Sequence, residues 1–523
     1  MLTAASVIRN FYRDSVTLMQ LSSQLSQLPG IRQASAIMAS ETNRALLREA
    51  GLATDEVEAG PDDLLIAIEA DSEAALEAAM AEARGTFDRK SDGPASAAQR
   101  EPPHSLEMGL EAMPAANLAL ISTPGDYAAA EAMKALHLGL NVMLFSDNVT
   151  LEDEIALKRY AGARGLMVMG PDCGTAILGG LPLGFANVVR RGDIGLVAAS
   201  GTGLQEVTCL IDQLGYGVSQ AIGTGGRDLR REVGGLTMHQ GLDALAGDPD
   251  TRVIVLLSKA PAPEVAVRVL DSARQTGKPV VVNFLGADPK GLAASNLHAA
   301  KTLEDAATIA VALAAGRQPD DVGFPSSAVD LPRLGPGRRY VRGLYSGGTF
   351  CSEAAMLLSE HVAPVYSNTP IGGAEPLADV WHSRGHTLID LGADVFTRGR
   401  PHPMIDHRLR NDRIAIEVQD PETAVLLLDV VLGYGSHPDP AAAMAPAVAA
   451  AIADAARGGG KLAVIGFVCG TEADPQNLAR QQAGLRDAGM ILTQTNAQAV
   501  RLAARIAGTA TGSIQDSAKA GLK

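Results

Sequence analysis

Residues 195–214 read GLVAASGTGLQEVTCLIDQL, and residues 343–360 read GLYSGGTFCSEAAMLLSE. In both stretches an apolar run leads into a Gly-rich turn, and apolar residues then recur at helical spacing. Apolar strands without polar alternation are typical of parallel strands that are buried on both faces. The two stretches therefore predict the strand, tight turn and helix that repeat in a doubly wound α/β sheet.

The two stretches each open a series of blocks that match in order. Residues 221–235 pair with 389–406, residues 248–258 with 420–433, and residues 277–289 with 460–475. Four pairs in one order predict a tandem duplication. Each copy would span roughly 130 to 170 residues, which is enough for a hydrophobic core of its own.

Shifts in composition divide the rest of the chain. The segments 89–112 and 319–338 are rich in Ser, Pro, Gly and charge, which indicates linkers. In the N-terminal module we expect strands at 6–14, 31–40 and 62–70 and helices at 15–30 and 72–83. The predicted parts are a small α+β module at 1–88 with a packing or assembly role, a Rossmann-like segment at 113–190, a first copy at 191–318, a second copy at 339–510 and a tail at 511–523.

Composition and charge exclude several classes of function. The chain has 523 residues, 55 of them Gly, and a formal net charge of −15. Nucleic acids and anionic membranes would repel such a chain, although small anions can still bind in local basic pockets. The cysteines form no CxxC pair, so we expect neither a disulfide framework nor a zinc site. These cysteines are Cys173, Cys209, Cys351 and Cys469.

The sequence also indicates where the protein resides. No run of about 18 apolar residues is present that would span a membrane. Charged residues appear too early at the N-terminus for a signal peptide. We therefore expect a soluble, cytoplasmic protein.

The two Gly-rich turns are the first candidates for chemistry. Ligands of open parallel sheets bind beyond the carboxyl ends of the strands, where helix N-termini attract anions. The candidate phosphate- or substrate-binding residues are Ser200, Gly201, Thr202, Gly203 and Glu206 in the first copy and Ser346, Gly347, Gly348 and Thr349 in the second. Each turn is equally compatible with a tight connection that binds nothing.

A second pair of turns carries arginines. Arg227 follows a strand of the first copy, and Arg398, Arg400 and His402 follow the corresponding strand of the second. Guanidinium groups bind anions bidentately, and an imidazole can act as general base, general acid or phosphate acceptor. We expect Arg398, Arg400 and His402 to be catalytic. The alternative for His402 is a loop histidine that only makes a local hydrogen bond.

Two further turns carry acidic residues, and two common nucleotide-binding motifs do not occur in the sequence. Asp172, a further candidate for phosphate or substrate binding, precedes Cys173 in MGPDCGT. Cys173 is expected to be structural because no histidine lies beside it. Glu472 and Asp474 in GTEADPQ could hold a polar substrate or a metal, or could form a solvated turn. We assign no metal site. No P-loop and no dinucleotide-binding GxGxxG is present, so neither motif supports nucleotide binding.

At this point the motifs resemble a known family. The stretch 122–175, with ASGTGLQE and IGTGGRD after it, is similar to the α subunit of succinyl-CoA synthetase, and the second copy resembles the ligase domain of the β subunit. SDNVTLEDE, MGPDCGT, ASGTG, GGRDL, LYSGGT, GRPHPMID and GTEADP together resemble the FdrA proteins up to about residue 508. The resemblance implies a Rossmann-like CoA-binding half-domain at 113–190 and two flavodoxin-like CoA-ligase domains at 191–318 and 339–510.

The resemblance also suggests activities. FdrA-type proteins are associated with allantoin and purine catabolism as the large component of oxamate carbamoyltransferase, which converts oxalurate and phosphate into oxamate and carbamoyl phosphate with companion subunits. This transferase requires no CoA or ATP. The alternatives are an ATP- and CoA-dependent acyl-CoA synthetase and a non-catalytic scaffold subunit. The phosphohistidine of the family is not transferred to this chain, because His298 lacks the glycines that flank it.

Overall fold

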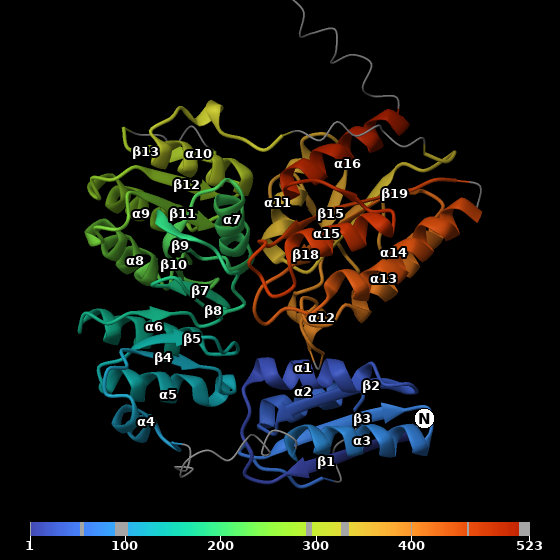
Figure 1. The fold of residues 1–523 in the computed structure, drawn as a ribbon, viewed down its shortest axis with the longest axis horizontal. Helices are drawn as coiled ribbons and strands as arrows, with labels where there is room; N and C mark the ends of the chain where they lie inside the picture. The colour runs from blue at the N-terminus through green and yellow to red at the C-terminus, as the bar shows by residue number, and fades with distance from the viewer. Residues whose placement is uncertain are drawn as a thin grey trace, which may run out of the picture. The chain divides into compact units, whose positions relative to one another are not determined.

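The computed structural model describes residues 2–52, 57–88, 103–288, 295–325, 334–398, 400–457 and 460–511. The chain divides into two compact units, each with its own sheets (Figure 1). The first unit comprises Met1–Cys173 and Asp394–Asp406, and the second comprises Gly174–Ala393 and His407–Lys523. None of the helices in the described ranges has the length and apolar character needed to cross a bilayer.

The first unit begins with a small α+β module. Its elements are β1 (Leu2–Ile8), α1 (Ser15–Ser26), β2 (Ile31–Met38), α2 (Glu41–Glu49), β3 (Leu64–Ala70) and α3 (Glu73–Asp88), with an antiparallel sheet in the order β1-β3-β2. The strand predicted at 6–14 was wrong in its bounds. The observed strand β1 ends at Ile8, because Asn10 takes a positive φ of 48°. Asp14 then caps α1 by accepting from the Thr17 amide. Helix α2, which the sequence reasoning missed, is capped by Ser40.

A three-stranded parallel sheet follows in the first unit. It comprises β4 (Leu118–Ile121), α5 (Gly125–His137), β5 (Asn141–Leu144), α6 (Leu151–Gly162) and β6 (Val168–Met169), in the order β4-β5-β6. One correction concerns the predicted linker at 89–112, of which residues 89–102 lie outside the described residues. Its end forms α4 (Leu106–Ala112), because Ser105 caps this helix and Leu106 and Leu110 pack on the core of this sheet.

The first copy lies in the second unit. Its strands are β7 (Thr175–Leu178), β8 (Leu181–Gly184), β9 (Arg191–Ala198), β10 (Val218–Gly223), β11 (Val253–Ser258), β12 (Val280–Phe284) and β13 (Leu297–Ala299), and its helices are α7 (Gly201–Gln213), α8 (Leu236–Gly247), α9 (Pro263–Gln275), α10 (Leu303–Ala315) and the 3-10 helix η3 (Pro319–Asp321). The predicted segment 113–190 is therefore divided. Strands β7 and β8 leave it because β7 pairs with β10 and extends the sheet of the first copy.

The second copy also lies in the second unit. Its strands are β14 (Tyr340–Tyr345), β15 (Val365–Ser367), β16 (Glu375–Pro376), β17 (His386–Asp390), β18 (Thr423–Val431), β19 (Ala463–Cys469) and β20 (Ile491–Leu492), and its helices are α11 (Gly348–Ser359), α13 (Arg408–Gln419), α14 (Pro440–Arg457), α15 (Leu478–Asp487) and α16 (Asn496–Thr511). The short helix α12 (Asp394–Thr397) belongs to the first unit. The tail predicted at 511–523 lies outside the described residues from 512 onward, and so does 326–333 of the second linker.

The sheets of the two copies share one strand order. The first contains β13-β12-β11-β9-β10 and the second β20-β19-β18-β14-β17, with parallel pairing throughout both series. The copies differ at one edge, where the first adds the antiparallel β7 and β8 and the second adds β15 and β16. The doubly wound α/β class and the duplication are thus confirmed.

Candidate functional site

The structure brings the starts of α7 and α11 together (Figure 1). Ser200 caps α7 and accepts from the Gly203 amide at 3.0 Å, whereas α11 begins after Gly347, a glycine without a capping side chain. The first N–H groups of a helix carry the positive end of its dipole, so both starts favour an anion. The two predicted Gly-rich turns are therefore neighbours.

The contacts between the two turns are reciprocal. The Ser200 Oγ and Thr349 Oγ1 atoms lie 2.5 Å apart. A Cβ added at Gly203 would lie 3.3 Å from Thr349 Cγ2, and one added at Gly347 would lie 3.1 Å from Thr202 Cγ2. Each glycine thus makes room for the threonine of the other copy, as expected where duplicated elements face each other.

Two charged residues that the sequence reasoning missed also approach α11. A Cβ added at Gly348 would lie 2.6 Å from Asp390 Oδ2 and 3.3 Å from the ammonium nitrogen of Lys259. Lys259 directly follows β11 and is exposed, and Asp390 ends β17. A charged residue at the carboxyl end of an apolar strand was the signal that could have identified both.

A buried ion pair fixes the backbone of the second Gly-rich turn at Ser346 and Gly347. The Ser346 and Gly347 amides and the Ser346 hydroxyl all donate to the Asp429 carboxylate, at 2.8 to 2.9 Å. Arg410 pairs with the same carboxylate at 2.7 Å, and both side chains are fully buried. Ser346 and Gly347 were predicted to bind a ligand, but these donors already have an internal acceptor.

Glu206 lies away from the turn in which it was predicted to act. It occupies the sixth position after its helix cap, Ser200, and Glu353 occupies the sixth position after Gly347. Burial, and then the Glu353 carboxylate, raises the pKa of Glu206 to about 8. Burial raises the pKa of Glu353 to about 7, although Leu303 N and Asn496 Nδ2 donate to it. Both carboxyls are therefore buried parts of the helix packing.

The three predicted catalytic residues lie in the first unit, whereas the paired turns lie in the second. Arg398 and Arg400 are exposed, and Arg398 forms a long ion pair with Glu49 at 3.8 Å. His402 is partly buried, and its Nδ1 accepts from the Met404 amide at 3.2 Å. This bond leaves Nε2 as the nitrogen that can carry the proton of the neutral ring.

The remaining predicted residues have local structural contacts. Glu472 Oε2 accepts from Asn477 Nδ2 at 3.0 Å and from the Ala479 amide at 3.4 Å, so it caps the start of α15. Asp172 is exposed in a turn with a φ of 57°, and its amide donates to Ser146. Arg227 lies partly buried in the turn after β10.

The neighbouring acids and thiols are structural as well. Asp228, beside Arg227, caps α8 by accepting from the Thr237 and Met238 amides. Asp474 accepts from Asn187 and Val188, and burial raises its pKa. The four cysteines are buried, and burial raises the pKa of Cys209 to about 11 and that of Cys351 to about 12. Neutral buried thiols are poor nucleophiles.

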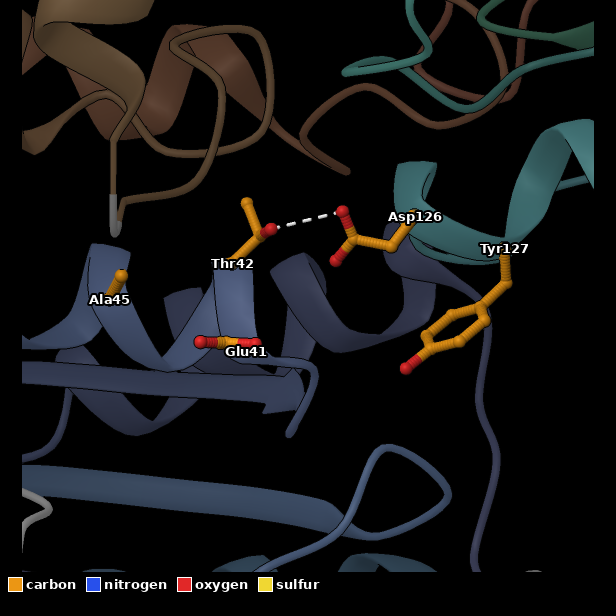
Figure 2. Close-up of a pocket in the computed structure, with 5 residues that line it drawn as sticks. All are labelled: Glu41, Thr42, Ala45, Asp126 and Tyr127. Carbon is orange, nitrogen blue, oxygen red and sulfur yellow. Dashed lines mark hydrogen bonds between the residues drawn. The ribbon is translucent and has the colours of Figure 1, made fainter.

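The first unit contains a cavity between residues of α2 and α5 (Figure 2). Its volume is about 480 Å³, and it is lined by Glu41, Thr42, Ala45, Asp126 and Tyr127. The Thr42 hydroxyl donates to Asp126 across it at 3.0 Å.

Comparison with known families agrees with this architecture. The CoA-ligase family model matches residues 344–506, and the model of the succinyl-CoA ligase like flavodoxin domain matches residues 191–317. A model described as the AllF heavy metal-associated domain matches residues 1–103. Together with the duplicated sheets, these matches define a succinyl-CoA-synthetase-like protein.

Individual relatives narrow the assignment. "Uncharacterized protein YahF" of Escherichia coli (strain K12) is 43% identical over 93% of this chain and 95% of that protein. The chain therefore belongs to the FdrA/AllF-like family of succinyl-CoA-synthetase-like proteins.

More distant relatives are CoA ligase subunits. The ADP-forming sulfoacetate-CoA ligase subunit SauD of Bilophila wadsworthia is 29% identical over 35% of this chain and 63% of its own length. The ADP-forming succinate–CoA ligase subunit alpha of Aquifex aeolicus is 28% identical over 33% of this chain and 57% of its own length. The chain thus spans less than two thirds of either ligase subunit.

Solved structures show only a loose likeness. The apo form of the dinucleotide forming acetyl-coenzyme A synthetase 1 of Ca. Korarchaeum cryptofilum aligns over 76% of this chain and 85% of that chain, with 17% identity and a TM-score of 0.31.

The heavy metal in the name of the N-terminal family model does not fit the residues present. Soft and borderline metals are held mainly by thiolate and imidazole ligands, and residues 1–103 contain no Cys and no His. Among the described residues, no group of three or more His, Cys, Asp or Glu side chains is arranged to hold an ion. We therefore assign this module no metal chemistry.

Proposed function

We propose that this protein transfers an acyl or carbamoyl group to or from a small anion at the paired starts of α7 and α11. The observation that supports the proposal is the contact between these two helix starts beside the ammonium of Lys259. The N–H groups at Gly348 and Thr349, the Lys259 ammonium and the hydroxyls of Ser200 and Thr349 would bind phosphate oxygens. Charge-assisted hydrogen bonds of this kind are the strong ones.

The particular reaction that we propose is oxamate carbamoyl transfer, with the chain as the large subunit. A phosphate oxygen attacks the carbamoyl carbon of oxalurate, the bond from that carbon to the bridging nitrogen breaks, and a proton passes from phosphate to that nitrogen. The products are carbamoyl phosphate and oxamate. The site must stabilise the oxyanion that develops at the attacked carbon, which helix N–H groups do well. This reaction requires neither CoA nor ATP.

The biological setting of this proposal is the breakdown of allantoin and purines, with companion subunits present. The support is the FdrA/AllF-like family and the AllF-type N-terminal domain. Arg398, Arg400 and His402 of the first unit are proposed, on the chemistry of their side chains alone, to bind a carboxylate and to transfer a proton. Arg227 and Asp172 remain proposed contributors to substrate binding.

The test is an assay of oxalurate phosphorolysis by the full chain with its companion proteins, followed as carbamoyl phosphate formation. We expect phosphate-dependent product without added nucleotide or CoA. Absence of product from the complete set of subunits would exclude the carbamoyltransferase.

A second candidate is an acid–CoA ligase that uses ATP, which the ligase relatives favour. The polar turns after β4, β5 and β6 would then hold CoA, which supplies a thiol that accepts the acyl group. His298 lies on β13, where the pairing with Val281 holds it in the sheet, so we assign it no phosphoryl transfer. CoA-dependent release of ADP without oxalurate would favour this candidate. If the chain binds neither phosphate nor CoA, a scaffold subunit is the remaining class.

A further inference from the structure

One carboxylate interrupts an otherwise apolar strand of the second copy. Strand β18 has the sequence TAVLLLDVV, and all of its residues are buried. Asp429 lies in its carboxyl-terminal half with a side chain that is 0% exposed. Burying a charge is costly unless partners compensate it, so the contacts of this carboxylate require explanation.

Four donors surround the Asp429 carboxylate. Its Oδ1 accepts from the Ser346 amide at 2.8 Å and from Arg410 Nη1 at 2.7 Å. Its Oδ2 accepts from the Ser346 hydroxyl at 2.8 Å and from the Gly347 amide at 2.9 Å. Successive backbone amides that converge on one anion are typical of a phosphate-binding nest. Here the bound anion is a side chain of the protein itself.

The Arg410 guanidinium, which pairs with this carboxylate, has further contacts of its own. Arg410 Nη1 also donates to the Asp429 carbonyl at 2.7 Å. Arg410 Nη2 contacts His407 Nδ1 at 2.8 Å and Met444 Sδ at 3.0 Å. The guanidinium is therefore held between α13, α14 and β18, and it fixes the carboxylate in turn.

The first copy lacks this arrangement. With the helix caps Ser200 and Gly347 matched, Val197 corresponds to Leu344. Val197 pairs with Leu256 as Leu344 pairs with Leu428, so the counterpart of Asp429 is Leu257. The amide of Ala199 in the first turn donates to the carbonyl of Leu257 instead. The two turns are thus equivalent in topology but not in their hydrogen bonding.

We propose that Asp429 is a positioning residue that acts as a built-in anion for the second turn. By occupying the Ser346 and Gly347 amides, it directs an external anion to the next N–H groups, those at Gly348 and Thr349 beside Lys259. The identity of the external ligand, phosphate, rests on the proposed function. The role of Asp429 in ordering the turn does not depend on that function.

The test uses Asp429→Asn in the full chain, with two readouts. Hydrogen–deuterium exchange in the peptide that covers 344–352 reports the turn, and the increase in unfolding temperature caused by inorganic phosphate reports the site. We expect about tenfold faster exchange at the turn and loss of the phosphate-induced shift. The matched control is Glu154→Gln, which breaks the buried Lys158–Glu154 pair of the first unit at 2.8 Å and should change neither readout.

A double variant separates positioning from simple stability. Asp429→Asn leaves the buried Arg410 charge unpaired, and this by itself should lower the unfolding temperature. Asp429→Asn with Arg410→Gln removes both charges, so the unfolding temperature should largely recover while exchange stays fast and the phosphate shift stays absent. Wild-type protection of the turn, or an unchanged phosphate shift, in the double variant would overturn the proposal. A wild-type protein without any phosphate shift would refute the phosphate site, while exchange at 344–352 would still decide the role of Asp429.

Discussion

Lys259 is the residue whose charge matters most for the proposed site. Its ammonium lies beside the uncapped start of α11. Lys259→Gln should weaken binding of inorganic phosphate about tenfold, because a charge-assisted hydrogen bond is lost. Isothermal titration calorimetry measures the effect. The matched control is Lys301→Gln, which removes an ammonium paired with Glu360 at 2.7 Å on the surface. Equal affinities for the two variants would contradict the site.

His402 is tested by its effect on rate. If its imidazole transfers the proton, His402→Ala should slow oxalurate phosphorolysis at least about tenfold. His382→Ala is the control, because His382 is an exposed histidine that pairs only locally with Asp379 at 2.7 Å. A rate for His402→Ala that matches this control would place His402 among loop residues that stabilise the backbone.

Glu206 carries a pH dependence whose sign follows from burial. Its folded pKa is about 8, above that of an ordinary carboxyl, so the folded protein prefers the neutral acid. Its favourable contribution is complete below about pH 4.5 and is lost as the pH rises through 8. The free energy of unfolding of Glu206→Gln, relative to that of the wild type, should therefore be higher at pH 8.5 than at pH 5 by a few kcal/mol.

Urea unfolding at pH 5 and at pH 8.5 measures this difference for the wild type and the variant. The control, Glu131→Gln, changes a carboxylate that pairs with Lys134 on a helix surface and should leave the pH dependence as it is. Parallel stability curves for wild type and Glu206→Gln would show that this carboxyl is ionised in the folded protein.

Close packing between elements limits which glycines can change. Gly125 opens α5, and a Cβ there would lie 2.4 Å from the Asp147 carbonyl oxygen and 2.8 Å from the Asn148 backbone. Backbone atoms cannot move aside cheaply, so Gly125→Ala should lower the free energy of unfolding by about 2 to 3 kcal/mol. Gly109 lies in α4 with no heavy atom within 4 Å of such a Cβ. Gly109→Ala should be neutral or stabilise by about 0.5 to 1 kcal/mol.

At the level of elements, most of the strand–turn–helix units were predictable. Their apolar strands are buried on both faces, which produces the continuous apolar runs seen in β11 and in β9 from Ile194 onward. Two short helices were not predictable in this way. Helices α2 and α4 are only 9 and 7 residues long and begin at the caps Ser40 and Ser105. Helix α2 buries only Leu47 and α4 buries no residue, so neither has the long apolar face that marks a helix in a sequence.

The whole molecule contains two compact units with separate sheets. Unfolding should therefore not be two-state, and the calorimetric enthalpy should exceed the van't Hoff enthalpy. Gly125→Ala, in the first unit, should shift one calorimetric component and leave the other in place. A single transition with equal enthalpies would show that the units unfold together.

The sequence by itself determined the doubly wound α/β class, the duplication and the two Gly-rich turns, because buried parallel strands and helix starts leave local patterns of residues. Only the tertiary structure decided that Ser200 meets Thr349, that Lys259 approaches Gly348 and that Asp429 occupies the second turn. It also assigned His402 and Ser200 to different units. These contacts join residues far apart in the chain, and strand order, which brings them together, is set by packing between elements and leaves no local signal.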